Sequence, residues 1–277
     1  MCSINGVVKL KGSITEKEFN KFKGICERAT NRGRDSFGYT AFSKGGGILS
    51  SAKNTGKFSN DFFEFVEGSK VLISNNRAEP TTEFVKDKKV TDVQPFTDAT
   101  GRFTVVHNGT IANDKELKKL HGWKLETEVD SAVIPEVLNK FWDRSKGQHP
   151  LTAFKDCLKH LKGSFSLAVH DTQESGVLYL AVNYKPLFIE RIKRTMFFSS
   201  LEEFLGDMDS IRHLGRNILQ IPPYSVVRID GGDIECMDLL ETPMTKKKAL
   251  VVCSGGLDSI VVAKKMIDDK SEIGYRR

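Results

Sequence analysis

Cys2 is the residue at the start of this sequence whose type and position could do chemistry. Removal of Met1 would leave Cys2 with a free α-amino group, so that a thiol and an amine stand on one residue. An α-amine has a reference pKa of about 7.7–8.0 and can act as the local base for a neighbouring nucleophile. Taken alone, a cysteine in second position is more simply a buried strand residue.

Two glycine-containing segments further along could complete such a site. Arg32–Gly38 reads RGRDSFG before an apolar run, and on its own it is typical of a loop with solvated charges. His107-Asn108-Gly109 follows apolar residues, and Asn-Gly after a strand usually makes a tight turn. The functional alternative is that the Asn108 amide and the Gly109 N–H converge about 2.7–3.1 Å from a developing oxyanion and stabilise it.

These segments occur in one order with several others, and the ordered set resembles the class II glutamine amidotransferases. Members of that family have an N-terminal nucleophile and hydrolyse glutamine to release ammonia. The matching segments are Cys2, Arg32–Gly38, Arg77, Gln94-Pro95-Phe96, His107-Asn108-Gly109 and Thr127-Glu128-Val129-Asp130-Ser131, followed by weaker matches at 161–165, 185–187, 197–200 and 221–223. The resemblance covers about residues 2–240 and implies an α+β fold, the four-layer αββα sandwich of N-terminal-nucleophile hydrolases.

The resemblance also implies a role for each matching residue. Cys2 would attack the side-chain amide of glutamine and form a γ-glutamyl thioester, with Asn108 and Gly109 as the oxyanion hole. Arg77 would bind the α-carboxylate of glutamine through paired hydrogen bonds, and Asp130 would pair with its α-ammonium. Without the family pattern, Arg77 would be a surface ion-pair member and Asp130 a helix cap.

Three residues near these positions have less defined roles. Arg32 is grouped with the substrate-binding residues, although ordering the surroundings of the nucleophile is its expected part, and His107 is expected to be structural. After Arg77 the chain reads Ala-Glu-Pro-Thr-Thr, where sugar-amidating relatives carry an aromatic residue, a threonine and a histidine. Thr81 or its neighbour Thr82 is expected to assist glutamine binding.

A second signature lies near the end of the sequence. The hexapeptide at 254–259, SGGLDS, stands between the apolar run 249–253 and an apolar helical stretch at 260–267, and it resembles the PP-loop of ATP pyrophosphatases. A glycine-rich turn between strand and helix presents backbone N–H groups to phosphate oxygens. The ATP-binding candidates are Ser254, Gly255, Gly256, Asp258 and Ser259, with Asp258 as the magnesium candidate. The glutaminase domain itself is expected to need no cofactor or metal; ATP and magnesium would serve a complete PP-loop domain.

A glutaminase followed by a PP-loop resembles two known arrangements. In asparagine synthetases a helical segment of some tens of residues separates the two. Here the junction is short, which is more similar to fusions with a 7-cyano-7-deazaguanine synthase-like domain, associated with archaeosine in archaeal tRNA and with modified guanine in phage DNA. The expected function is to supply ammonia to a 7-cyano-7-deazaguanine base in tRNA or DNA. The alternatives are amidation of a carboxylate, as in asparagine synthetases, and a catalytically silent glutamine-binding module.

Only 18 residues follow Ser259. We therefore expect a truncated product, a synthetase split onto a partner chain, or a free-standing glutaminase. The expected partners are glutamine and an ammonia-accepting synthetase domain or chain.

A layered set of strands and helices must position these residues. A strand is expected at Ile4–Val8, followed by a helix that begins with the capping box of Thr15 and Glu18. Further strands are expected at 37–42, 47–51, 71–74, 103–106, 165–169, 177–182, 187–189, 196–198, 218–221 and 226–229, and helices at 131–141, 151–161 and 201–205. The predicted domains are 1–244, a lysine-containing linker at 245–248, and the PP-loop fragment 249–277.

The amino-acid composition excludes several classes of protein. With 39% hydrophobic and 28% charged residues in 277, a disordered or fibrous chain is excluded, and a net charge of +6 is no nucleic-acid signature by itself. The longest apolar run, 177–182, is far below the roughly 18 residues of a membrane span. Five scattered cysteines argue against a disulfide framework or a zinc site. We expect a cytoplasmic protein without a membrane partner.

Overall fold

The computed structural model describes residues 2–56, 58–78, 89–143, 147–206 and 218–240. The predicted boundary at 244–248 and the PP-loop fragment at 249–277 lie outside the described residues, as does Thr81.

Two antiparallel sheets form the centre of the described unit. The first has the strand order β11-β9-β10-β1-β4-β2-β3 and the second the order β13-β12-β8-β7-β6-β5. The strands of the first sheet are β1 (Ser3–Lys9), β2 (Ser36–Ser43), β3 (Ile48–Asn54), β4 (Ser69–Arg77), β9 (Phe188–Ile192), β10 (Thr195–Ser199) and β11 (Ile218–Gln220). Those of the second are β5 (Phe96–Thr97), β6 (Phe103–Ile111), β7 (Gly163–Asp171), β8 (Leu178–Val182), β12 (Ser225–Asp230) and β13 (Asp233–Asp238).

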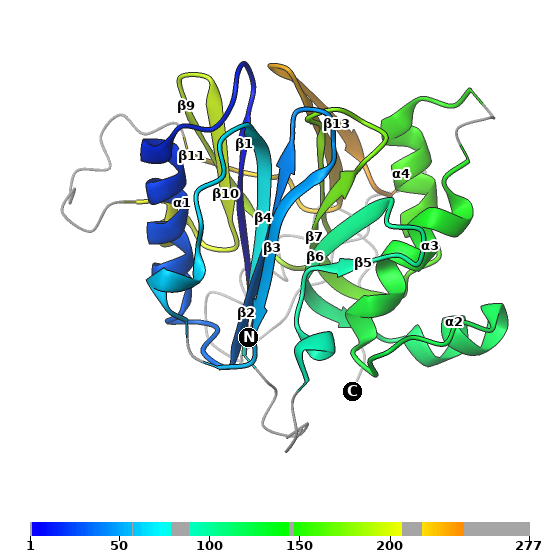
Figure 1. Ribbon diagram of the computed structural model, residues 1–277. Coiled ribbons are helices and arrows are strands. Elements are labelled where there is room, and N and C mark those ends of the chain that lie inside the picture. Colours follow the sequence, from blue (N-terminus) through cyan, green and yellow to red (C-terminus); the bar gives the residue numbers. More distant parts are fainter. Residues whose placement is uncertain (1, 57, 79–88, 144–146, 207–217, 241–277) are drawn as a thin grey trace, which may run out of the picture. The chain divides into compact units, whose positions relative to one another are not determined.

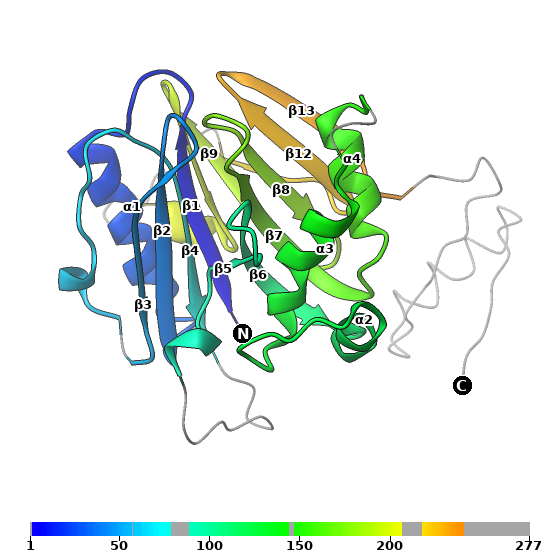
Figure 2. The ribbon, with the colours of Figure 1, turned by 45° about the vertical axis from the view of Figure 1, so that its right-hand side comes forward.

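Helices cover the outer face of each sheet, so that the unit has four layers (Figures 1 and 2). The helices are α1 (Glu16–Ala29), α2 (Asp114–His121), α3 (Val133–Phe141), α4 (Pro150–Leu158) and α5 (Glu202–Leu205), with short 3-10 turns η1 (Asn60–Phe62), η2 (Val90–Asp92) and η3 (Asp130–Ala132). α1 packs on the first sheet, and α3 and α4 pack on the second. The predicted αββα sandwich is confirmed.

The inner faces of the two sheets form a core of their own. Ile4 and Val8 of β1 pack there with Val106 of β6 and Ala168 of β7. Because successive side chains of a strand point to opposite faces, Val7 lies on the other side of β1, in the core beneath α1. β1, which begins directly after Cys2, is therefore held between two layers of buried apolar side chains.

The sequence pattern missed one helix. In α2 only Leu117 is buried, so this helix has no apolar stripe from which a helical period could be recognised. The helix expected at 131–141 begins as the 3-10 turn η3 and becomes α-helical at Val133. Across the described ranges, no helix has both the length and the apolar character to cross a membrane.

The expected capping box is present at the start of α1. Thr15 Oγ1 accepts from the Glu18 N–H, and the Glu18 carboxylate accepts from the Thr15 N–H. Lys9 and Thr195 also donate to this carboxylate, so it joins the helix to β1 and β10. Burial alone would raise the pKa of Glu18, but these hydrogen bonds outweigh it and lower the pKa to about 2.

We expect Glu18→Gln to lower the free energy of unfolding at neutral pH by about 1.5–3 kcal/mol, because the amide can keep the capping hydrogen bonds but loses the charge that strengthens the contact with Lys9. The folded-state pKa lies below the ordinary value of 4.5, so this contribution is complete above that pH and is lost as the pH falls toward 2. Urea unfolding of both proteins across the acid range measures it. The exposed Glu16→Gln is the control and should cost less; a Glu18→Gln deficit that does not shrink in acid would contradict the explanation.

Candidate active site

The start of β1 places Cys2 in the middle of the first sheet. β1 lies between β10 and β4, and Ser3 pairs with Asn76, close to the end of β4. Cys2 is a free thiol and half-buried, and its Sγ lies 3.8 Å from the carbonyl oxygen of Ala78. Since Ile4 faces the second sheet, the alternation of side chains directs Cys2 toward that sheet as well.

Asn108 and Gly109 lie inside β6, so the tight-turn alternative is wrong. They pair with Ser166 and Phe165 of β7. Gly109 has a φ of +154°, and a Cβ there would lie 1.9 Å from the carbonyl oxygen of Ser164, so no side chain fits at this position. Asn108 is buried, and its Nδ2 donates to Ser200 Oγ at 3.4 Å.

The edge of β6 that faces away from β7 carries a row of donors. The His107 N–H donates to Gln94 Oε1 at 2.6 Å, and the Ile111 N–H donates to Asp130 Oδ2 at 2.6 Å. Alternate residues of an antiparallel strand point their N–H groups to the same edge. The N–H of Gly109, which stands between these two residues, therefore points away from the ladder, between the Gln94 side chain and the Asp130 carboxylate.

Asp130 binds the last residue of β6 on this edge. Besides the Ile111 N–H, its carboxylate accepts the Ser131 N–H at 2.8 Å through Oδ1. The helix-cap alternative for Asp130 is wrong, because Asp130 is the first residue of η3 and the N-cap is Val129, without a side-chain cap hydrogen bond. A carboxylate has about four acceptor sites, so Asp130 keeps capacity for a further donor such as an ammonium group.

Arg77 ends β4 in the row next to Cys2. It pairs with Ser36 at the start of β2, and its Nη1 donates to the carbonyl oxygen of Asp92 at 2.9 Å. Burial would raise the pKa of Asp92, but a hydrogen bond from Thr127, the Lys89 N–H and the charge of Arg77 lower it. Arg77 is therefore steadied by η2, which is itself tied to the segment that leads to Asp130.

His107, which the sequence predicts to be structural, is enclosed by hydrogen-bond partners. It is buried, and its Nδ1 lies 2.6 Å from Ser131 Oγ. Burial lowers the pKa of His107, opposed in part by the charge of Asp130. Its carbonyl oxygen accepts from Gln94 Nε2 and from Asn75 Nδ2, each at 3.1 Å. The contact with Asn75 joins β4 to β6 across the inner core.

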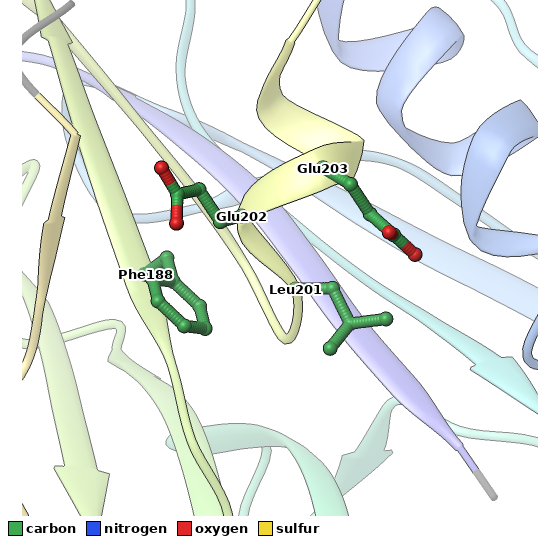
Figure 3. Close-up of a pocket in the computed structure, with 4 residues that line it drawn as sticks. All are labelled: Phe188, Leu201, Glu202 and Glu203. Atoms are coloured by element: carbon green, nitrogen blue, oxygen red, sulfur yellow. The ribbon is translucent and has the colours of Figure 1, made fainter. Parts of the chain in front are cut away.

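Arg32 lies close enough to Cys2 for their charges to interact. Burial lowers the pKa of Arg32, while the charges of Cys2 and then Glu203 raise it. Glu203 borders a cavity of about 500 Å³ with Phe188, Leu201 and Glu202. In Figure 3, Glu202 extends toward Phe188 and Glu203 away from it. The turn after Arg32 abuts β4, since a Cβ on Gly33 would lie 2.3 Å from the carbonyl oxygen of Asn76.

The structure thus brings Cys2, Arg32, Arg77, Asn108, Gly109 and Asp130 to the ends and edges of β1, β4 and β6. The sequence did not predict two polar residues that contact the candidate site residues: Asn75, which donates to the carbonyl oxygen of His107, and Ser200, which accepts from Asn108. A sequence signal for Asn75 existed: the polar run Ser74-Asn75-Asn76 directly follows the apolar run Val71–Ile73 of the same strand. The ATP-binding candidates Ser254, Gly255, Gly256, Asp258 and Ser259 lie outside the described residues, so the structure does not test them.

Comparisons with known proteins agree with this geometry. Residues 81–206 match the family described as "Glutamine amidotransferase domain". The fold is similar to glutamine PRPP amidotransferase from B. subtilis, with a TM-score of 0.65 and 17% identity over 87% of this chain and 50% of that one. It is also similar to a glutamine aminotransferase class-II domain protein from Silicibacter pomeroyi, with a TM-score of 0.51 and 13% identity over 87% of this chain and 100% of that one. Residues 81–206 are therefore similar to glutamine amidotransferase domains, and the fold is similar to the folds of these two solved proteins.

Similar curated proteins extend over more than this domain. A protein named 7-cyano-7-deazaguanine synthase from Saccharolobus solfataricus is 39% identical over 99% of this chain and 58% of its own length. One from Sulfurisphaera tokodaii, named 7-cyano-7-deazaguanine synthase 2, is 38% identical over the same shares. The chain spans less than two thirds of the length of these relatives.

Gly38 tests how tightly the site is packed. A Cβ there would lie 2.0 Å from the carbonyl oxygen of Gln94, the residue that holds His107. We expect Gly38→Ala to lower the free energy of unfolding by about 1–3 kcal/mol, because backbone must move. Denaturant unfolding measures this. Gly45→Ala is the control, since its nearest contact would be an ordinary 3.7 Å; equal stability of the two variants would show that the clash is absent.

Proposed function

We propose that this chain hydrolyses glutamine with Cys2 as the nucleophile. The Cys2 thiolate attacks the side-chain carbonyl carbon of glutamine and forms a tetrahedral intermediate. The amide nitrogen takes a proton from the α-ammonium of Cys2 and leaves as ammonia, which gives a γ-glutamyl thioester. Water then cleaves the thioester, releases glutamate and returns the thiol.

The observation that carries this proposal is the Gly109 N–H on the free edge of β6, beside the buried amide of Asn108. Both donors are held by backbone and buried contacts, so they need little reorganisation when charge develops on the carbonyl oxygen. We assign them as the oxyanion hole. Pairing with β7 holds both residues in a strand, whereas a turn at this position would leave the two donors less rigidly oriented.

The charged residues on either side would select free glutamine. Arg77 binds the α-carboxylate and Asp130 the α-ammonium, and Thr81 contributes to the same end of the substrate. Arg32 orders the surroundings of the thiolate, which its electrostatic interaction with Cys2 supports. Free glutamine, whose α-carbon carries both an ammonium and a carboxylate group, fits Arg77 and Asp130 better than a glutamine residue within a peptide does.

For the ammonia acceptor we propose a 7-substituted 7-deazaguanine. Support comes from relatives named 7-cyano-7-deazaguanine synthase, whose similarity covers 99% of this chain, including the PP-loop-like segment. By contrast, the matching glutamine–fructose-6-phosphate aminotransferases from Streptococcus pyogenes and Bacillus licheniformis align with 36% and 58% of it. An ATP-dependent acceptor reaction would use the ATP site at Ser254–Ser259, with magnesium at Asp258, and a synthetase domain or partner chain, whereas addition of ammonia to a nitrile balances without ATP.

Within this proposal the base in tRNA or DNA is the final acceptor, and ammonia adds to its 7-cyano group. Synthesis of the free nitrile base and asparagine-synthetase-like amidation are the alternatives. Incubating the protein and the synthetase part of its relatives with ¹⁵N-amide glutamine, and locating the label by mass spectrometry, separates the three. Label in asparagine, or in any product other than a deazaguanine, would contradict the proposed acceptor class.

Cys2→Ala is expected to abolish ammonia release from glutamine by the protein lacking Met1. The reason is that alanine has no thiol with which to form the thioester. A coupled glutamate dehydrogenase assay of ammonia measures it, and circular dichroism checks the fold. Cys236→Ala removes an exposed free thiol elsewhere and should keep full activity; activity that survives in Cys2→Ala would rule out the mechanism, and an inactive wild type would favour the silent glutamine-binding module.

Arg77→Lys is expected to raise the KM for glutamine at least roughly tenfold with a smaller change in kcat. An ammonium cannot reproduce paired hydrogen bonds to a carboxylate, and such bonds to charged groups are worth about 1.5–3 kcal/mol. Steady-state kinetics measures the effect. Arg191→Lys, on an exposed strand end, is the control; an unchanged KM in Arg77→Lys would remove Arg77 from the substrate site.

A further inference from the structure

Ser200 stands where the first sheet meets the oxyanion-hole residue of the second. It follows β10 directly and is fully buried. Its own N–H donates to the carbonyl oxygen of Ile4 at 3.1 Å, which extends the pairing of β10 with β1. The main chain of Ser200 is therefore fixed to the strand that begins beside Cys2.

The Ser200 hydroxyl makes a second set of contacts. Ser200 Oγ accepts the N–H of Ile4 at 3.0 Å and accepts from Asn108 Nδ2 at 3.4 Å. These two donors occupy both lone pairs of the hydroxyl oxygen. Its proton points back to the carbonyl oxygen of Ile4, at 3.5 Å. One oxygen atom thus joins the second residue after the nucleophile to the amide of Asn108.

This contact also decides which way the Asn108 amide faces. An amide nitrogen carries two hydrogens. One hydrogen of Asn108 Nδ2 points to Ser200 Oγ, which fixes the direction of the second hydrogen. Rotation of the amide would break this hydrogen bond and leave a buried polar group unpaired. Such a loss costs more in a low-dielectric interior than it does in water.

We propose that Ser200 is a positioning residue for glutamine hydrolysis: its hydroxyl holds the Asn108 amide at a set place relative to Cys2, so that the second amide hydrogen meets the oxyanion of the tetrahedral intermediate. This inference rests on the proposed glutaminase function. It adds that β1, which begins beside the nucleophile, and β6, which carries the oxyanion hole, are joined by the side chain of Ser200 at the end of β10, although β1 and β6 belong to different sheets.

The neighbouring Ser199 supplies a matched control. It is equally buried, but its Oγ donates to Asn5 Oδ1 at 2.8 Å and it makes no contact with Asn108 in the described part of the chain. Asn5 lies on the opposite face of β1 from Ile4, by the alternation of the strand. Ser199→Ala and Ser200→Ala therefore each delete one buried hydroxyl, on opposite faces of the same sheet.

The test compares both variants with the wild-type full chain lacking Met1. Glutamate γ-semialdehyde is the probe of the oxyanion hole, because its aldehyde forms a tetrahedral thiohemiacetal with Cys2; L-glutamate probes ground-state binding alone. We expect Ser200→Ala to lower kcat about ten- to a hundredfold, less than loss of an oxyanion donor itself. Its KM and its inhibition by glutamate should change less than about threefold, while inhibition by the aldehyde weakens in proportion to kcat.

Other outcomes are equally decisive. Ser199→Ala should keep aldehyde inhibition near the wild-type value, and Ser200→Thr, which retains an Oγ, should recover much of the loss. If Ser200→Ala does not fold, Ser200→Cys keeps the volume with a weak acceptor and should still weaken aldehyde inhibition more than glutamate inhibition. Equal losses in Ser199→Ala and Ser200→Ala, or unchanged aldehyde inhibition in a folded Ser200 variant, would overturn the inference. An inactive wild type would instead reject the proposed function.

Discussion

The packing of the inner faces of the two sheets is the constraint on which the site depends. Cys2 belongs to one sheet, and Asn108 and Gly109 belong to the other. Their separation is therefore set by the apolar side chains between the sheets, such as Ile4 and Val106. Protein interiors pack as densely as organic crystals, so this spacing has little freedom. A site split over two sheets gains precision from a core that cannot be compressed.

Polar side chains that cross the same core add direction to this spacing. Asn75 reaches from β4 to the carbonyl oxygen of His107, and Ser200 joins Ile4 to Asn108. Apolar contacts resist compression but tolerate sliding, whereas a hydrogen bond loses strength steeply when its angle changes. These crossings therefore fix the lateral register of one sheet over the other. A buried polar group without its partner costs about 1–3 kcal/mol, which favours this single arrangement.

The residues proposed to bind the charged end of glutamine are held differently, by loops at the edge of the sandwich. Arg77 donates to the carbonyl oxygen of Asp92, which Thr127 holds in turn. Asp130 accepts the N–H of Ile111, two residues after Gly109. The loops proposed to bind the substrate are thus tied to the same strand that carries the proposed oxyanion donors. The groups that bind the charged end of glutamine and the groups that polarise its side-chain amide would both be positioned by β6.

Most of the local structure could be predicted from short sequence patterns, and the order of a few motifs suggested the candidate site residues. The order of Cys2, Arg77, Asn108-Gly109 and Asp130 indicated the family and the four layers, and Thr15 with Glu18 indicated where α1 begins. These features succeed because they depend on residues near one another in the chain or on a short motif. The helix α2 was not foreseen, since it buries a single leucine and has no readable period.

The way in which the candidate site is assembled could not be predicted, because it depends on contacts between segments that are distant in the sequence. The tertiary structure placed Asn108-Gly109 inside a strand, where local pattern favoured a turn, because β7 pairs with both residues. It gave Ser200 its contact with Ile4 across 196 positions of sequence, and Asn75 its contact with His107 across 32. Such contacts follow from strand register and from the packing of one sheet on another. Both arise only when distant segments bury their apolar faces together, and no local pattern in the chain encodes that distance.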